Sequence, residues 1–362
     1  MVLRLHTGVC SLFGIRYPLF LAGMAGGPST PELVAAVSEA GGLGTLGAAY
    51  MEPDAIGAAI DEIRRRTDAP FAVNLFALRA VDDNARIREV QPVLNTMRDA
   101  LGLPQAGPEP AATRDLLDAQ LAVLLEKKVP VISTAFGLLD EPALREAKAA
   151  SIRVVAMATT VREAVLAEQA GCDAVVAQGT EAGGHRGTFD VRRHPMGANI
   201  GTFALVPQIA DSVKLPVLAA GGIMDGRGLV AALALGAQGV QLGTRFLTAA
   251  ESGAHPAYRQ QLLDSTEEST VLTKAFSGRP ARGIANGFIR QWDASGIEPL
   301  PFPTQNTLTR DVRNEAAKQN NPDYMSLWAG QGTRQLTSGQ TAGDIVAEIM
   351  NEAKALIGSV SE

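Results

Sequence analysis

A glycine-rich loop carries the side chain best suited to acid–base chemistry. His185, one of four histidines in the chain, stands among glycines at positions 179, 183, 184 and 187. The apolar run 174–177 precedes this loop and predicts a buried strand. Glycine lets a backbone approach a ligand closely, and imidazole titrates near neutral pH. We therefore predict that His185 is a catalytic acid or base at the carboxyl end of a strand, the alternative being a structural histidine.

Two further small-residue pairs follow the last two strands that the sequence predicts. One pair is Gly221 and Gly222, and the other is Gly243 and Thr244. Their exposed backbone N–H groups, with helix N-termini behind them, favour a phosphate group. The alternative is that these residues only close tight turns. Because both pairs fall on consecutive strands, we predict a phosphate-bearing cofactor or substrate.

Amide side chains stand in or beside the same series of strands. Asn74 interrupts an apolar run, Gln178 ends another, and Gln241 lies within a third. Amides both donate and accept hydrogen bonds, which suits the edge of a heterocycle such as flavin. Gly23 and Met24 follow the first strand, where the backbone could approach a flat ring. The alternative for each amide is a hydrogen bond satisfied inside the core.

Apolar runs alternate with helix-like segments from the first strand onward. The predicted strands are 18–22, 43–46, 71–76, 129–134, 153–158, 174–177, 216–220 and 240–242. The predicted helices are 31–40, 54–66, 114–127, 141–150, 161–170, 202–212 and 226–236. Continuous apolar strands indicate a parallel sheet that is buried on both faces. This pattern predicts an α/β fold, the (β/α)8 TIM barrel, with a doubly wound open sheet as the second choice.

Two regions depart from the alternation. Residues 79–113 contain four prolines and are longer than an ordinary connection, so we expect an excursion with a helix near 84–100. Later, 269–273 could form an edge strand, while 299–338 is rich in Pro, Asn, Gln and Gly and predicts loops. The expected division is a barrel over 1–265 with an insertion near 79–113, a smaller cap over 266–338, and a C-terminal helix over 339–362 that packs back on the barrel.

Composition excludes several classes of protein. The 362 residues carry a net charge of −6, which argues against an extended nucleic-acid surface. Cys10 and Cys172 are too few for a disulfide framework or a four-cysteine metal site, so we expect a reducing, cytoplasmic location. Residues 1–9 lack a signal-peptide core, and no uncharged run reaches membrane-spanning length. No HExxH pattern or cysteine pair appears, so we expect no metal.

Several segments together resemble those of a known enzyme family. Residues 182–187, Ala-Gly-Gly-His-Arg-Gly, are followed by 220–223 and 241–244, and this combination resembles the nitronate monooxygenases, formerly called 2-nitropropane dioxygenases. Further matching segments are 22–24, 73–76, 276–283 and 327–332. The last of these contains Trp-Ala-Gly-Gln-Gly and is similar to the class I branch.

The resemblance implies an FMN-dependent TIM-barrel enzyme without a metal. Members oxidise alkyl nitronates such as propionate 3-nitronate with O2 to a carbonyl compound and nitrite. The catalytic histidine of the family matches His185, which either abstracts a proton from a neutral nitroalkane or serves mainly to bind an ionised nitronate. The implied cofactor-binding residues are Ala22, Gly23, Met24, Asn74, Gln178, Gly183, Gly221, Gly222, Gln241, Leu242, Gly243 and Thr244.

Two other functions fit the same barrel. FMN-dependent enoyl-thioester reductases and NAD(P)H:quinone reductases share the histidine loop, and a flavin-binding protein without turnover would keep the cofactor site alone. The expected partners are a small nitronate and O2, with no nucleic acid and no membrane, and the chain could form a homodimer. Class I members often line the substrate pocket with several tyrosines and a lysine. The tyrosines of this chain are Tyr17, Tyr50, Tyr258 and Tyr324.

Overall fold

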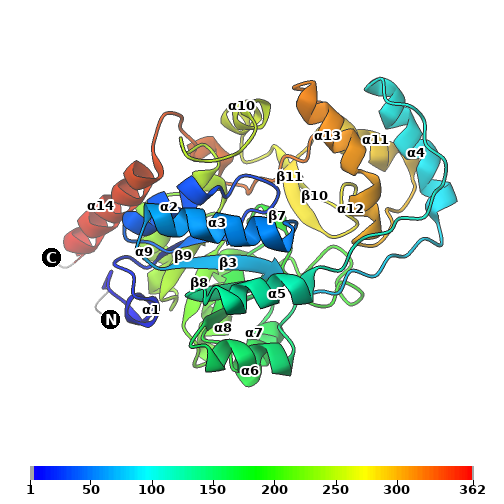
Figure 1. Cartoon of the computed structure of the whole chain (residues 1–362). Helices are drawn as coiled ribbons and strands as arrows, with labels where there is room; N and C mark the ends of the chain where they lie inside the picture. Colours follow the sequence, from blue (N-terminus) through cyan, green and yellow to red (C-terminus); the bar gives the residue numbers. More distant parts are fainter. Residues whose placement is uncertain (1–3, 361–362) are drawn as a thin grey trace.

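Eight parallel strands form the centre of the molecule in a computed structural model, which describes residues 4–360 (Figure 1). Their spatial order is β1-β9-β8-β6-β5-β4-β3-β2. The strands are β1 (Leu19–Leu21), β2 (Gly44–Gly47), β3 (Phe71–Phe76), β4 (Val131–Ala135), β5 (Arg153–Ala158), β6 (Ala174–Gln178), β8 (Val217–Ala220) and β9 (Gly239–Leu242). All eight predicted strands are therefore present, and only their ends differ from the prediction.

The two outermost strands of this sheet, β1 and β2, meet each other. Phe20 pairs with Leu43 in a parallel bridge just before β2. The N–H of Leu21 donates to the carbonyl of Leu43 at 2.9 Å, and the N–H of Leu43 donates to the carbonyl of Leu19 at 2.9 Å. The sheet thus closes on itself. The (β/α)8 barrel is confirmed, and the alternative of an open doubly wound sheet is wrong.

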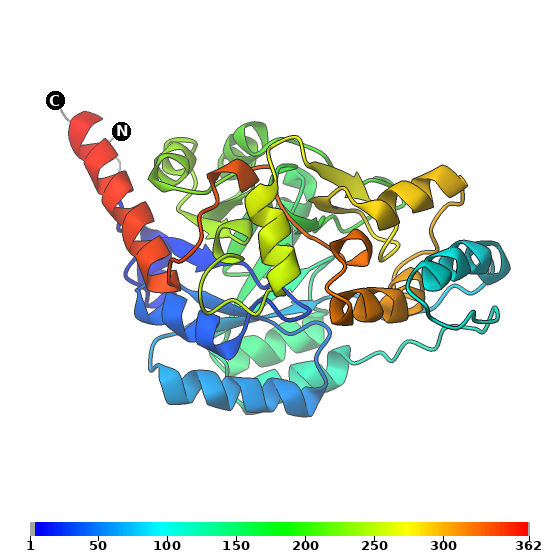
Figure 2. The same ribbon diagram turned by 90° about the horizontal axis from the view of Figure 1, so that it is seen from above.

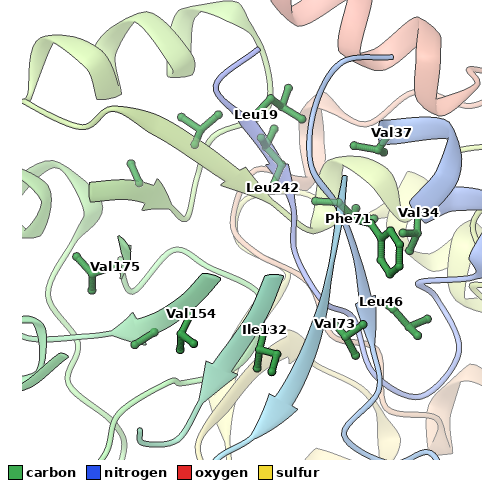
Figure 3. Close-up of a cluster of buried hydrophobic side chains, with 14 of the residues drawn as sticks. Leu19, Val34, Val37, Leu46, Phe71, Val73, Ile132, Val154, Val175 and Leu242 are labelled. Carbon is green, nitrogen blue, oxygen red and sulfur yellow. The ribbon is translucent and has the colours of Figure 1, made fainter. Parts of the chain in front are cut away.

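The strands are apolar throughout because both of their faces are buried. Val73, Ile132 and Val154 are register neighbours on β3, β4 and β5, and they point outward into the layer beneath the helices (Figure 3). The residues between them, such as Ala72 and Val131, belong to a second cluster inside the barrel. Since side chains alternate along a strand, two such layers require an unbroken apolar run.

A short N-terminal helix that the sequence did not predict, α1 (Gly8–Phe13), covers one end of the barrel. Val9, Cys10 and Phe13 are buried against the residues inside the barrel. The rings of Phe13 and Phe20 meet edge to face with their centroids 5.3 Å apart. The amino end of the barrel is thereby filled with side chains, which leaves the carboxyl end for a site.

Helices surround the barrel in the order that the sequence predicts. They are α2 (Pro31–Glu39), α3 (Pro53–Arg66), α5 (Leu117–Glu126), α6 (Glu141–Ala149), α7 (Val161–Ala170), α8 (Thr202–Ser212), α9 (Gly226–Ala234) and α14 (Ala342–Val360). Side-chain oxygens of Thr30, Asp140, Thr160 and Asp225 cap four of them by accepting hydrogen bonds from N–H groups of the first turn. The C-terminal helix α14 packs against α9 and α2, so it takes the place of the eighth barrel helix (Figure 1).

Smaller elements lie beyond the carboxyl ends of the strands. The helices are α4 (Ile87–Ala100), α10 (Pro256–Asp264), α11 (Gly287–Ser295), α12 (Thr304–Leu308) and α13 (Arg310–Lys318), with single 3₁₀ turns η1 (Thr244–Phe246), η2 (Pro322–Tyr324) and η3 (Thr333–Gln335). A second sheet has the order β10 (Thr270–Thr273), β11 (Ala281–Ile284) and β7 (Gly184–His185). The edge strand predicted at 269–273 is confirmed. The prediction of loops over 299–338 is wrong where α12 and α13 form.

The excursion after β3 and the late helices share one apolar cluster. Val90 and Leu94 of α4 are buried together with Phe288 and Trp292 of α11 and Val312 of α13. Figure 2 shows α4 beside α13, on the side of the molecule away from α14. These elements form a structure with its own core above the barrel. Within residues 4–360, no helix has both the length and the apolar composition needed to cross a membrane.

Candidate active site

A cavity of about 870 Å³ lies at the carboxyl ends of the barrel strands. Every residue that the sequence predicts for the site contributes to its wall, namely Ala22, Gly23, Met24, Asn74, Gln178, Gly183, His185, Gly221, Gly222, Gln241, Leu242, Gly243 and Thr244. The structure therefore brings all of these residues together in one place. Their roles in catalysis and cofactor binding stay predictions.

The two glycine turns lie side by side at the rim of the barrel. Strands β8 and β9 are neighbours, with Ala220 paired to Gln241, so the turns that follow them are adjacent. Gly222 has φ of +72°, in the left-handed region that favours glycine. In residues 4–360, the backbone N–H groups of Gly222 and Gly243 donate no hydrogen bond to another residue. Such groups require a partner, and an anion is one that they could bind.

Gly243 is a position where the protein itself does not require glycine. Its φ of −111° suits any residue. A Cβ there would come no closer than 3.4 Å to its nearest neighbour, the Cβ of Ala22. At Gly222 a Cβ would meet nothing closer than the Cβ of Glu181, at 3.5 Å. The missing side chains therefore leave an open cradle in the cavity wall, which fits a phosphate-bearing cofactor.

Two other glycines of the wall are required by close packing. A Cβ at Gly183 would lie 2.4 Å from the backbone nitrogen of Gly330, and a Cβ at Gly23 would lie 2.4 Å from the Cβ of Asn74. Both distances are too short for a carbon atom. These glycines bring the loops around the cavity together, whether or not they touch a ligand.

The loop that carries His185 is held to the end of β6 by two buried side chains. Gln178 donates from Nε2 to the carbonyl of His185 at 3.0 Å, and its Oε1 accepts from the N–H of Gly187 at 2.8 Å. Arg186 is fully buried and donates to the carbonyls of Gly179 and Gln178 at 2.7 and 2.8 Å. These bonds orient the loop so that consecutive residues, 185 and 186, face in opposite directions.

His185 belongs to the short strand β7, which pairs antiparallel with β11. Its Nε2 lies 2.8 Å from the Oγ of Ser277. The Ser277 hydroxyl also lies 3.1 Å from the carbonyl of Arg279, to which it donates. In that arrangement Nε2 carries the proton and donates to Ser277, so Nδ1 keeps the lone pair that can accept a proton.

Aromatic rings enclose the imidazole of His185. Ring centroids lie 5.3 Å away for Trp328, 5.6 Å for Phe136, 6.1 Å for Phe76 and 6.4 Å for Phe302. These rings come from the barrel and from the late segment, so both parts build the pocket. Burial among them, together with the smaller effect of the nearby charges of Arg279 and Arg313, lowers the pKa of His185 to about 3. The imidazole is therefore neutral across the physiological pH range.

Two other predicted residues, Asn74 and Thr244, are held by hydrogen bonds that leave donors or acceptors for a ligand. Asn74 donates from Nδ2 to the Oγ of Ser133 at 2.9 Å. The Oγ1 of Thr244 accepts from the N–H of Gly330 at 3.0 Å, so its own proton can be donated. The amide oxygen of Asn74 and the hydroxyl of Thr244 suit a ring edge and a phosphate respectively.

The sequence did not single out several side chains of this site. Ser277, Arg279 and Trp328 lie in segments quoted for the family resemblance, but nothing in their types or spacing assigned them a contact with His185. Phe136 has positive φ and follows a predicted strand, which is a weak signal. For Arg313 no sequence signal exists, because it reaches the cavity only through the packing of α13. In the described part of the chain, no group of three or more His, Cys, Asp or Glu side chains could hold a metal ion.

Comparison with known proteins identifies relatives of the whole chain. A family model described as nitronate monooxygenase matches residues 7–352. A probable nitronate monooxygenase of Staphylococcus saprophyticus is 41% identical over 356 residues, which cover 98% of this chain and 99% of that protein. A probable nitronate monooxygenase of Bacillus subtilis is also 41% identical, over 94% of this chain and 97% of that protein.

Solved structures show the same architecture. The nitroalkane oxidase from Streptomyces ansochromogenes has a TM-score of 0.90 at 38% identity, covering 98% of this chain and 99% of that one. FabK from Thermotoga maritima has a TM-score of 0.78 at 32% identity, covering 99% of each chain. The resemblance noted in the sequence is thus confirmed over nearly the full length, and the chain belongs to the nitronate monooxygenase family of oxidoreductases.

Proposed function

We propose that this enzyme uses FMN and O2 to oxidise nitronates, and nitroalkanes that His185 can ionise, to a carbonyl compound and nitrite. The observation that carries the proposal is a neutral imidazole enclosed in an aromatic pocket, in the same cavity as two rim turns with free N–H groups. Membership of the nitronate monooxygenase family and the likeness to a nitroalkane oxidase support the same reaction class.

The donor set of the cavity fits FMN. The N–H groups of Gly222 and Gly243 would hold the phosphate with the hydroxyl of Thr244. Asn74 and Gln241 offer amides for the edge of the ring system, and Gln178 has one N–H left after its bonds to the histidine loop. When bound, FMN supplies a two-electron redox centre that can be oxidised again by O2.

His185 would act on the carbon that bears the nitro group. A neutral imidazole can accept the proton from that carbon at Nδ1 while Ser277 binds the proton on Nε2. The aromatic walls exclude water from the reacting atoms. For a substrate that is already a nitronate, no proton needs to be removed, and His185 would serve mainly in binding as part of the pocket wall. We also propose that residues 266–338, with the excursion at 79–113, act as the cap that completes this pocket.

A second candidate is an FMN-dependent reductase that takes electrons from NAD(P)H. The observation in its favour is the likeness to FabK over the whole chain, although its TM-score is lower than that of the nitroalkane oxidase. The two reactions differ in both electron donor and product, so one pair of assays separates them.

The experiment follows nitrite release and O2 consumption by the purified protein with FMN. With propionate 3-nitronate and no NAD(P)H, the proposal predicts that nitrite appears and O2 is consumed. Rapid oxidation of NAD(P)H without nitrite from any nitronate would favour the reductase. Bound FMN with neither reaction would indicate a flavin-binding protein without turnover.

A further inference from the structure

A buried arginine connects the rim turn after β9 to the C-terminal helix α14. Thr244 lines the cavity, whereas the next residue, Arg245, is buried and extends its guanidinium to α14. Its Nη2 donates to the Oε2 of Glu348 at 3.0 Å and to the Oε1 of Gln340 at 2.7 Å. The Nε2 of Gln340 donates to the same oxygen of Glu348. Charged hydrogen bonds therefore tie this turn to α14.

The same guanidinium also joins the two rim turns to each other. The Nε of Arg245 donates to the carbonyl of Met224 at 3.2 Å. Met224 follows Gly222 by two residues, and Arg245 follows Gly243 by two residues. One side chain thus spans both of the turns whose N–H groups we propose for the FMN phosphate.

A second carboxylate of α14 supports the turn after β8. Glu352 lies one helical turn beyond Glu348, and its Oε2 accepts from the N–H of Gly226 at 2.8 Å. Gly226 is the first residue of α9, the helix that follows Gly222. A Cβ at Gly226 would lie only 2.5 Å from the backbone nitrogen of Ala353, so α14 packs directly on the start of α9 (Figure 1). Both rim turns are therefore held from behind by one helix.

The buried guanidinium of Arg245 depends on these carboxylates for its charge balance. Burial lowers the pKa of Arg245, and the carboxylates of Glu348, Glu352 and Asp225 oppose this effect. Within residues 4–360, Nη1 is buried and has no hydrogen-bond partner. Loss of the charge on Glu348 would leave the cation less compensated, and the side chain would then hold the two turns less firmly.

We propose that Arg245 and Glu348 are positioning residues that keep the two rim turns in the geometry that binds the FMN phosphate. The inference rests on the proposed use of FMN and makes α14 a part of the cofactor site. Neither side chain is among the residues that line the cavity, so both act through the backbone N–H groups of Gly222 and Gly243. A hydrogen bond weakens steeply when its donor is misaligned, so a small rotation of either turn reduces phosphate binding.

The test compares FMN with riboflavin, which has the same ring system and no phosphate. Fluorescence titration of the apoproteins gives the Kd of both flavins for wild type, Glu348→Gln and Glu146→Gln. The side chain of Glu348 is 43% exposed, so glutamine fits there without repacking the core. Glu146 is the matched control, because it is an exposed residue of α6 and its replacement removes the same charge. A general loosening of the fold would weaken both flavins, so the ratio of the two Kd values isolates the phosphate.

We expect wild type to bind FMN about 10-fold or more tightly than riboflavin. Glu348→Gln should reduce this preference about 3- to 10-fold, the size of one hydrogen bond, and leave the Kd of riboflavin unchanged. Glu146→Gln should keep the wild-type ratio. An unchanged ratio in Glu348→Gln, or equal weakening of both flavins, would overturn the inference.

Hydrogen exchange of wild type tests the same coupling without a substitution. Since coupling between two sites is reciprocal, FMN should slow amide exchange in α14 more than in α6, whereas riboflavin should slow the two helices alike. Equal protection of both helices by FMN would overturn the inference.

Flavin binding separates this inference from the proposed function. A wild type that prefers FMN to riboflavin but releases no nitrite would refute the proposed reaction, and the Glu348→Gln ratio would still decide the role of α14. A wild type that binds both flavins equally would overturn the inference whatever the nitrite assay gives.

Discussion

The Nε2 of His185 lies 2.8 Å from the Oγ of Ser277, a residue that follows it by 92 positions in the chain. Strand β7, which carries the histidine, pairs with β11, and β11 begins four residues after the serine in the chain. This pairing brings the two side chains together. When the serine hydroxyl donates to the carbonyl of Arg279, it accepts from the imidazole. The loop after β6 thus supplies the imidazole, and the late segment supplies the hydroxyl that contacts its Nε2.

Replacement of Ser277 by alanine should slow proton abstraction by His185 without displacing its ring from the pocket. With the hydroxyl gone, Nε2 has no fixed partner and the imidazole can adopt the other tautomer. We expect kcat on a neutral nitroalkane to fall about 3- to 10-fold, the size of one ordinary hydrogen bond. Steady-state nitrite release measures it, with Ser11→Ala on α1 as the control. An unchanged kcat would show that the contact does not orient the base.

Acid should destabilise the folded apoprotein through His185. Burial lowers its native pKa to about 3, whereas the unfolded side chain titrates near 6.5, so below that pH the unfolded state binds the extra proton. Stability is therefore lost as pH falls from about 6.5 toward 3. Between pH 7 and pH 5 we expect the free energy of unfolding of wild type to fall by about 2 kcal/mol more than that of His185→Gln.

Urea unfolding of both apoproteins at the two pH values measures this difference. His185→Gln is the control because glutamine has no proton to bind, while the carboxylates that also respond to acid are the same in both proteins. Equal losses in the two proteins would mean that the imidazole is already protonated, or freely hydrated, in the native state.

Arg186 should contribute far more to the stability of the protein than the arginines that are exposed at its surface. Its guanidinium satisfies three buried carbonyls, those of Gln178, Gly179 and Ala198. Arg186→Met leaves these acceptors without a donor, and we expect a loss of about 2–4 kcal/mol. Arg192→Met, at an exposed position of the neighbouring loop, should change stability by less than about 0.5 kcal/mol. Chemical unfolding at pH 7 compares them, and similar values for both would contradict the role of Arg186.

Gly243→Ala should fold normally and bind FMN poorly. The backbone at this position suits alanine, and the new methyl would stand in the cavity wall with no clash against the protein. We expect the Kd for FMN to rise about 10-fold or more, because a close backbone approach to the phosphate is blocked. The control is Gly57→Ala, in a helix remote from the cavity, which should leave Kd unchanged. Fluorescence titration of the apoproteins gives these Kd values. Equal Kd values for wild type and Gly243→Ala would contradict phosphate binding at this rim.

The barrel could be predicted from sequence because its signal is local. Strands buried on both faces must be apolar throughout, and the glycines that follow β8 and β9 can be recognised directly in the sequence. In contrast, α13 buries only Val312 and Ala316, and five of its nine residues are charged, so its sequence offers few apolar positions from which to predict it. Strand β7 has two residues, too few for any pattern. These elements form only because the late segment packs on the barrel.

The residues of the candidate site also fall into a group that the sequence could predict and a group that it could not. Residues at the ends of barrel strands, such as Asn74 and Gly222, could be found because the fold alone places them at one rim. Ser277, Trp328 and Arg313 could not, because their contacts depend on segments more than 90 residues from His185 in the chain. A rim can be deduced from topology, whereas a pocket wall depends on tertiary packing.

Turnover by His185→Asn on two forms of one substrate tests the account most directly. FMN-loaded wild type and variant are given 1-nitropropane as the neutral nitroalkane and, separately, as its preformed nitronate, and nitrite is measured. If a neutral imidazole removes the proton, the variant should lose about 10²- to 10⁴-fold on the nitroalkane and far less on the nitronate. Equal losses on the two forms, or no loss on the nitroalkane, would contradict a catalytic base at His185.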